Sequence, residues 1–150
     1  MTTTAQNPQS RQDPTKDTTE ASLAALETLF DRAAGDMLDS EIFEAIEAEL
    51  RRLHARIRIH HSADQILANQ DQFGPELAEE LNRLRSEHPT IIGLLDRLIR
   101  LAESIPDRTL EDKEVFILRG REVIAFLRRH EAEEDRLFYL SVWRETGGES

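Results

Sequence analysis

Three of the five histidines fall at positions where a helix would bury them. They are His60, His88 and His130, and each is in register with Leu and Ile residues that recur at spacings of three and four. Two of them are followed four residues later by a carboxylate, at Asp64 and Glu134. Residues four apart share one helix face, about 5–6 Å apart at Cβ, so each pair can reach a single metal ion. An inward carboxylate without a counter-charge is costly, and a bound cation would supply that charge.

The chain contains no cysteine, so any metal site must be built from His, Asp and Glu side chains. Disulfides, thiolate zinc sites, iron–sulfur clusters and thiol catalysis are therefore excluded. Mixed imidazole and carboxylate ligands suit iron, manganese or zinc. Neither the Glu-x-x-His pairs of ferritin-like oxidases nor the His-Glu-x-x-His signature of zinc proteases occurs in the sequence.

The composition indicates a single acidic domain. A chain of 150 residues suits one domain, and a formal net charge of −11 argues against nucleic acid or an anionic membrane surface as a partner. No secretory signal and no run of 18 apolar residues is visible, so we expect neither export nor a membrane span. A chain without cysteine fits the reducing cytoplasm, which is the expected location.

The elements that must position the histidines are predicted to be four helices. Apolar residues recur at spacings of three and four, and no segment alternates with the period of two that a strand needs. Turns at 35–39, 69–74 and 105–107 separate the four stretches, and Pro75 and Thr109 suit the starts of the third and fourth helices. Short connections favour antiparallel neighbours, so we expect an all-α, up-down-up-down four-helix bundle.

Composition also predicts where the bundle begins and ends. Residues 1–18 are mostly Thr, Gln, Asn, Asp and Pro, which bury too little apolar surface to offset the entropy of ordering. We therefore expect a disordered tail over residues 1–18, the bundle over 19–144 and a flexible C-terminus over 145–150.

Two segments of the chain are similar to each other. Residues 58–67 read RIHHSADQIL and residues 128–137 read RRHEAEEDRL, so the histidine and the carboxylate align. This arrangement resembles the hemerythrin-like, or HHE cation-binding, domains, in which the second and fourth helices each carry a His followed four residues later by a carboxylate. His88 on the third helix also matches the family, whereas Asp64 stands where Glu is usual. The resemblance covers roughly residues 20–143.

The resemblance implies a non-haem iron centre, di-iron rather than mononuclear, with manganese or zinc as alternatives. Its ligands would be His60, Asp64, His88, His130 and Glu134. Carboxylates would bridge the irons, and one iron position would stay open to oxygen, peroxide or nitric oxide. The implied activity is to bind, sense or detoxify such a molecule.

One usual ligand of the family is missing from the first helix. No histidine precedes His54, and the first helix should reach the metal layer between Asp17 and Glu20. Either Asp17 or Glu20 supplies a carboxylate there, or water fills the position, or the site holds one metal instead of two.

Each candidate residue also has a simpler interpretation. His130 and Glu134 could form a hydrogen bond that only fixes the register of the bundle, and His88 could bond a backbone carbonyl. His61 and Glu131 lie one step off the buried stripes, so we expect both on solvated faces, with a position next to the metal ligands as the alternative. The alternative function is a metal-free bundle that binds a partner protein or a second copy of the chain.

Overall fold

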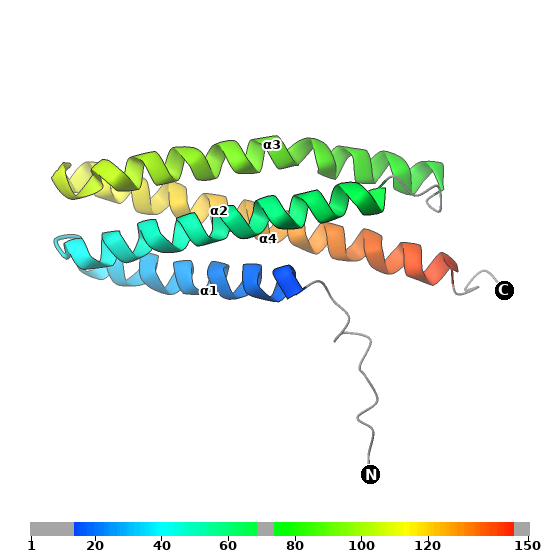
Figure 1. Cartoon of the computed structure of the whole chain (residues 1–150). Helices are drawn as coiled ribbons and strands as arrows, with labels where there is room; N and C mark the ends of the chain where they lie inside the picture. Colours follow the sequence, from blue (N-terminus) through cyan, green and yellow to red (C-terminus); the bar gives the residue numbers. More distant parts are fainter. Residues whose placement is uncertain (1–13, 69–73, 146–150) are drawn as a thin grey trace, which may run out of the picture.

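The computed structural model describes residues 14–68 and 74–145, with side chains described for 18–61 and 74–140. It contains four long helices and one short 3-10 helix: α1 (Pro14–Gly35), α2 (Ser40–Ala68), α3 (Pro75–Ser104), η2 (Ile105–Asp107) and α4 (Leu110–Glu145). The long helices lie side by side (Figure 1). No strand occurs in the described ranges, so the prediction of an all-helical chain is confirmed.

The helix ends follow the local signals in the sequence. The Oγ1 of Thr109 accepts a hydrogen bond from the backbone N–H of Asp112 at 3.2 Å, which caps the start of α4 as predicted. Pro75 is the first residue of α3, where its missing N–H costs nothing. The Oδ1 of Asp39 likewise accepts from the N–H of Glu41 at 2.9 Å, next to the start of α2.

Helix α1 begins a few residues before the predicted end of the N-terminal tail. The tail was expected to reach residue 18, but α1 already begins at Pro14. Proline presets the backbone angle of a first helical residue, and extending an existing helix by a turn costs little. Helix α4 likewise runs one residue past the expected end of the bundle, to Glu145. Residues 1–13 and 146–150 of the predicted termini lie outside the described residues.

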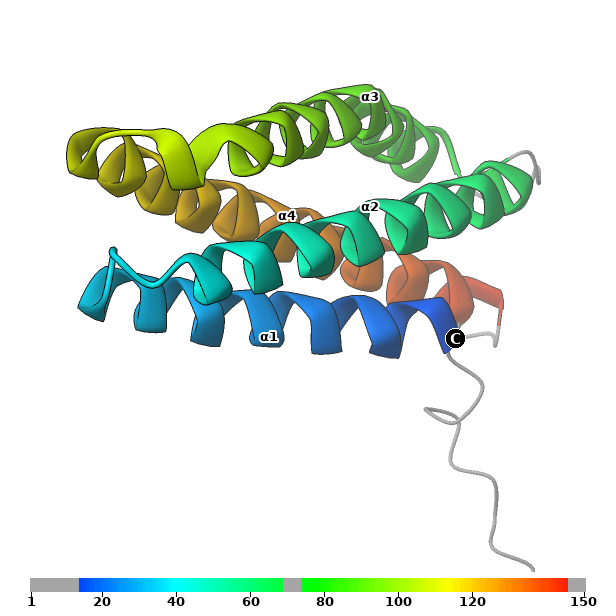
Figure 2. The ribbon, with the colours of Figure 1, turned by 60° about the vertical axis from the view of Figure 1, so that its left-hand side comes forward.

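The helices form a ring of contacts in which each packs on two others. Helix α2 contacts α1 and α3, and α4 contacts α3 and α1. Figure 2 shows α1 running along one side of α2, with α3 along the other side. Because α2 and α4 each have two neighbours, a wide arc of each is buried. No described helix has an apolar stretch of the length and hydropathy that a membrane crossing needs.

Two apolar clusters of unequal size fill the interior. The larger cluster contains a phenylalanine group in which the Phe116 ring lies 5.7 Å from that of Phe30 and 6.1 Å from that of Phe43. The smaller cluster is built on Leu84 and Leu137, with Leu77 beside them. In the sequences of α3 and α4, the buried histidines lie between the residues of these two clusters. Apolar packing therefore holds the histidine layer from both sides.

The Phe30 ring of α1 packs directly on the backbone of α4 at Gly120. A Cβ added at Gly120 would come within 3 Å of three atoms of that ring, whereas a Cβ at Gly93 in α3 would meet nothing within 4 Å. Phe30 is fully buried, so its ring has no free space to move into.

We therefore expect the two glycines to respond in opposite ways to alanine. Gly120→Ala should lower the free energy of unfolding by about 1–3 kcal/mol, because overpacking outweighs the gain in helix propensity. Gly93→Ala should raise it by about 0.5–1 kcal/mol, since only the propensity changes. Urea denaturation followed by circular dichroism measures both. Equal effects of the two substitutions would contradict the close contact with Phe30.

Candidate metal centre

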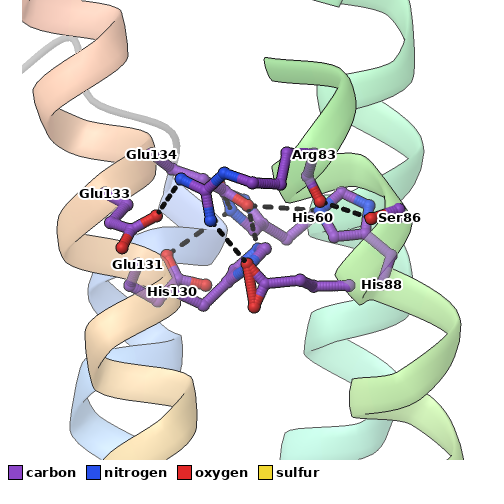
Figure 3. Close-up of polar contacts among 9 residues, drawn as sticks. His60, Arg83, Ser86, His88, His130, Glu131, Glu133 and Glu134 are labelled. Carbon is purple, nitrogen blue, oxygen red and sulfur yellow. Dashed lines mark hydrogen bonds and ion pairs between the residues drawn. The ribbon is translucent and has the colours of Figure 1, made fainter. Parts of the chain in front are cut away.

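Four histidines from three helices meet between the two apolar clusters. His60 and His61 come from α2, His88 from α3 and His130 from α4, and their exposed fractions are 4%, 7%, 7% and 1%. Figure 3 shows α4 on one side of the layer and the helices that carry His60 and His88 on the other. Burial of one imidazole is common in a core, but four in one layer require polar partners.

The carboxylate of Glu134 lies at the centre of this layer. Its Oε2 is 3.0 Å from the Nε2 of His60, and its Oε1 is 3.2 Å from the Nε2 of His88. The same Oε1 also contacts the Nε2 of His130. These contacts converge in Figure 3 from α2, α3 and α4. One side chain therefore connects three helices, with its two oxygens facing different histidines.

The first set of possible ligands, here called the imidazole group, consists of His61, His88 and His130. One ring nitrogen from each lies within 4.8 Å of the other two. The rings of His61 and His88 stack at 3.6 Å between centroids, with 6° between their planes. The centroids of His88 and His130 lie 5.0 Å apart. Three ring nitrogens converging in this way could hold one divalent ion.

The second set, here called the carboxylate group, consists of His60, Glu131 and Glu134. One nitrogen and two carboxylate oxygens, one from each residue, lie within 4.8 Å of one another. The Nε2 of His60 is 3.5 Å from the Oε2 of Glu131 and 3.0 Å from that of Glu134. Adjacent ligands of an octahedral ion bound at about 2.1 Å lie about 3 Å apart, so this spacing fits a metal ion.

The surroundings shift the pKa values of His61 and His130 in opposite directions. Burial lowers the pKa of His61 to about 3, and the neighbouring His88 adds to this effect. For His130, burial opposes the charged form, but the hydrogen bond and charge of Glu134, together with the charges of Glu131 and Glu87, outweigh it and raise the pKa. His61 is therefore neutral at pH 7, with a lone pair available to a metal.

Charged residues of α3 and α4 cover the outer side of the layer. The Oε1 of Glu87 lies 3.8 Å from the Nδ1 of His130, on the opposite side of the ring from Glu134. Arg83 binds Glu133 at 2.9 Å and lies 3.9 Å from Glu87 (Figure 3). The hydrogen bond and charge of Glu133 raise the pKa of Arg83. The negative charge of Glu87 is one of the causes of the raised pKa of His130.

The structure brings together four of the five residues that the sequence singled out. His60, His88, His130 and Glu134 all belong to the two groups described above. Asp64 lies in α2, but its side chain is outside the described residues.

The expectation that His61 and Glu131 face solvent is wrong. They are 7% and 8% exposed, and each is a member of one group. The helical period placed them one step off the stripe, but α2 and α4 each pack against two helices, which widens the buried arc. The signal that could have found them is their position directly after His60 and His130.

The proposed substitution of the missing ligand by Glu20 is also wrong. The Glu20 side chain is 62% exposed and pairs with Arg128 of α4 at 2.9 Å. The buried residues beside it on α1 are Thr19 and Ser22. Asp17, the other candidate, has no described side chain. Among residues 18–35, no side chain of α1 belongs to either group.

Comparison with protein-family models, with curated proteins and with solved structures finds no match to this chain. The function is therefore inferred from the residues of the centre themselves.

The low pKa of His61 predicts acid sensitivity of the metal-free protein. Between the folded pKa of about 3 and the unfolded value near 6.5, the unfolded chain binds more protons at this residue. Stability should therefore fall as pH drops below about 6.5. His130 has the opposite effect on the pH dependence of stability. Because its pKa is raised in the folded protein, its protonation contributes stability that is lost as pH rises through that pKa.

Chemical denaturation in EDTA at pH 7.5 and pH 5 tests this prediction. Between pH 7.5 and pH 5, the free energy of unfolding of wild type should fall by about 1–2 kcal/mol more than that of His61→Asn, because Asn cannot take up the proton. His54→Asn serves as the control, since His54 pairs with Asp96 at 2.9 Å away from the centre. A pH dependence of His61→Asn equal to that of wild type would contradict the assignment.

Proposed function

We propose that this protein is a hemerythrin-like, up-down-up-down bundle with a non-haem iron centre that binds, senses or detoxifies oxygen, peroxide or nitric oxide. The observation that carries the proposal is the position of Glu134, with one oxygen toward His88 and His130 and the other toward His60. A carboxylate placed in this way can bridge two ions.

The two groups support a dinuclear centre. Each group contains three donor residues. Glu134 is a member of the carboxylate group and also contacts His130 of the imidazole group. The two oxygens of Glu134 face different histidines, so one could bind an ion on each side. Two cations would also offset the buried negative charge of Glu131 and Glu134.

The donor types support iron. Imidazole nitrogen and carboxylate oxygen together suit ferrous and ferric iron, and the sequence provides no thiolate. Manganese and zinc use the same donors and are the alternatives for this centre. The carboxylates would suit the higher charge of an oxidised ion.

The surroundings support a small ligand. Three protein donors leave coordination positions open on an ion that prefers six, and sites with open positions are those that bind exogenous molecules. The residues that flank the layer are apolar and almost completely buried: Ile57, Leu84, Ile91, Leu127 and Leu137. Buried apolar residues around the layer would limit access of water to a diatomic molecule or peroxide bound there.

One observation favours the alternative of a metal-free interaction bundle. The described side chains of α1 add no ligand, and Glu20 instead forms an ion pair at the surface. Under this alternative, the carboxylates and imidazoles of the layer would only fix the register of the helices. A measurement of metal binding distinguishes the iron centre from the metal-free bundle.

Anaerobic loading with ferrous iron tests the proposal. Wild type should bind two irons per chain, and about 100-fold excess over Kd should stabilise the fold by about 2.7 kcal/mol per site. For a chain of this size, that raises Tm by about 5–10 °C per site. Exposure to air or nitric oxide should then change the visible spectrum. Iron analysis, thermal denaturation and absorption spectroscopy measure these effects.

Substitutions at two proposed ligands and at one histidine outside the centre test whether iron binds at the proposed residues. His130→Ala and Glu134→Gln should lose most of the bound iron and the rise in Tm, whereas His54→Ala should keep both. A wild type that binds no iron and gains no stability would contradict the metal centre and favour the interaction bundle.

A further inference from the structure

The two ligand groups differ in chemistry, although they share Glu134. The imidazole group offers three ring nitrogens, and the carboxylate group offers one ring nitrogen and two carboxylate oxygens. Nitrogen-rich sites favour borderline ions such as Zn²⁺ and Fe²⁺, whereas oxygen-rich sites favour harder ions such as Mn²⁺ and Fe³⁺.

We propose that the centre is asymmetric, with His61, His88 and His130 forming a position for a borderline divalent ion and His60, Glu131 and Glu134 forming a position for a harder ion. The protein would then hold two different metals side by side. This inference rests on the proposed metal centre and adds the identity and selectivity of its two positions.

An unpaired buried nitrogen points to an ion in the imidazole position. The Nε2 of His61 is buried and has no hydrogen-bond partner within residues 18–61 and 74–140. A buried polar atom of this kind costs about 1–3 kcal/mol unless a partner satisfies it. The His61 ring stacks on the ring of His88, at 3.6 Å between centroids. A metal ion bound with His88 and His130 would satisfy it.

Charge distinguishes the carboxylate position. Glu131 is 8% exposed, and the Glu134 side chain is 10% exposed, so two acidic groups lie in the interior, and both contact His60. At short range, an ion of higher charge or stronger preference for oxygen is stabilised more by two carboxylates than by neutral nitrogens. His60 of α2 completes this set, with its Nε2 3.5 Å from the Oε2 of Glu131 and 3.0 Å from the Oε2 of Glu134.

Each position has a residue that the other does not use. His61 belongs only to the imidazole group, and Glu131 belongs only to the carboxylate group. Substituting these two residues therefore removes a ligand from one position at a time, whereas Glu134 would affect both.

The experiment uses Zn²⁺ and Mn²⁺ as probes on the full chain, with one equivalent of each ion. Bound Zn²⁺ is measured by elemental analysis after desalting, and bound Mn²⁺ by loss of the electron paramagnetic resonance signal of the free ion. Wild type should hold one of each. His61→Asn should weaken Zn²⁺ binding at least about 100-fold and keep Mn²⁺, since losing even an outer partner of a ligand costs about 10- to 100-fold.

Glu131→Gln should give the reverse result, with Mn²⁺ lost and Zn²⁺ kept, and His60→Asn should agree with Glu131→Gln. Retention of one ion shows that each variant is folded. Glu133→Gln and His54→Asn are the matched controls, because Glu133 pairs with Arg83 and His54 with Asp96 outside both groups. Both controls should bind both ions.

Equal loss of the two ions in either variant would overturn the asymmetry and leave the metal centre intact. Binding of neither ion by wild type would overturn the metal centre and the asymmetry together. Selective loss in the expected direction would support the asymmetry even if the iron-loaded protein did not react with oxygen or nitric oxide.

Discussion

The interior of this protein depends on how the buried charge of Glu134 is balanced. A carboxylate in a nearly dry layer is costly, and three imidazoles from three helices contact it. Hydrogen bonding to His60 and His88 offsets part of that cost, and against the effect of burial the hydrogen bond and charge of Glu134 raise the pKa of His130. A bound cation would complete the balance for Glu134 and Glu131 together.

Packing determines where this polar layer can exist. The larger apolar cluster ends near Ile57, Ile91 and Leu127, and the smaller cluster begins at Leu84 and Leu137. The layer between them is supported on both sides by residues with well-defined rotamers, so the histidines are held by their neighbours as well as by each other. The helices could not shift along one another without moving apolar side chains out of register.

Much of the fold and four of the six residues of the two ligand groups could be predicted from residue periodicity. The spacing of Leu and Ile predicted the helices, and it placed His60, His88, His130 and Glu134 inward, because all of them are in phase with a stripe. His61 and Glu131 were missed because the width of a buried arc depends on how many helices pack around it, which no single helix reveals. Glu20 was misplaced for a related reason, since its partner Arg128 comes from α4, far away in sequence.

The ligand groups draw on chain segments that are far apart, with His61 in α2, His88 in α3 and His130 in α4. An ion held by all three would join these segments as a cross-link does, closing long loops that are open in the unfolded chain. No single helix retains enough donors to keep the ion when its neighbours separate. The residence time of a bound metal would therefore be governed by opening of the bundle, and its release would report how often α2, α3 and α4 come apart.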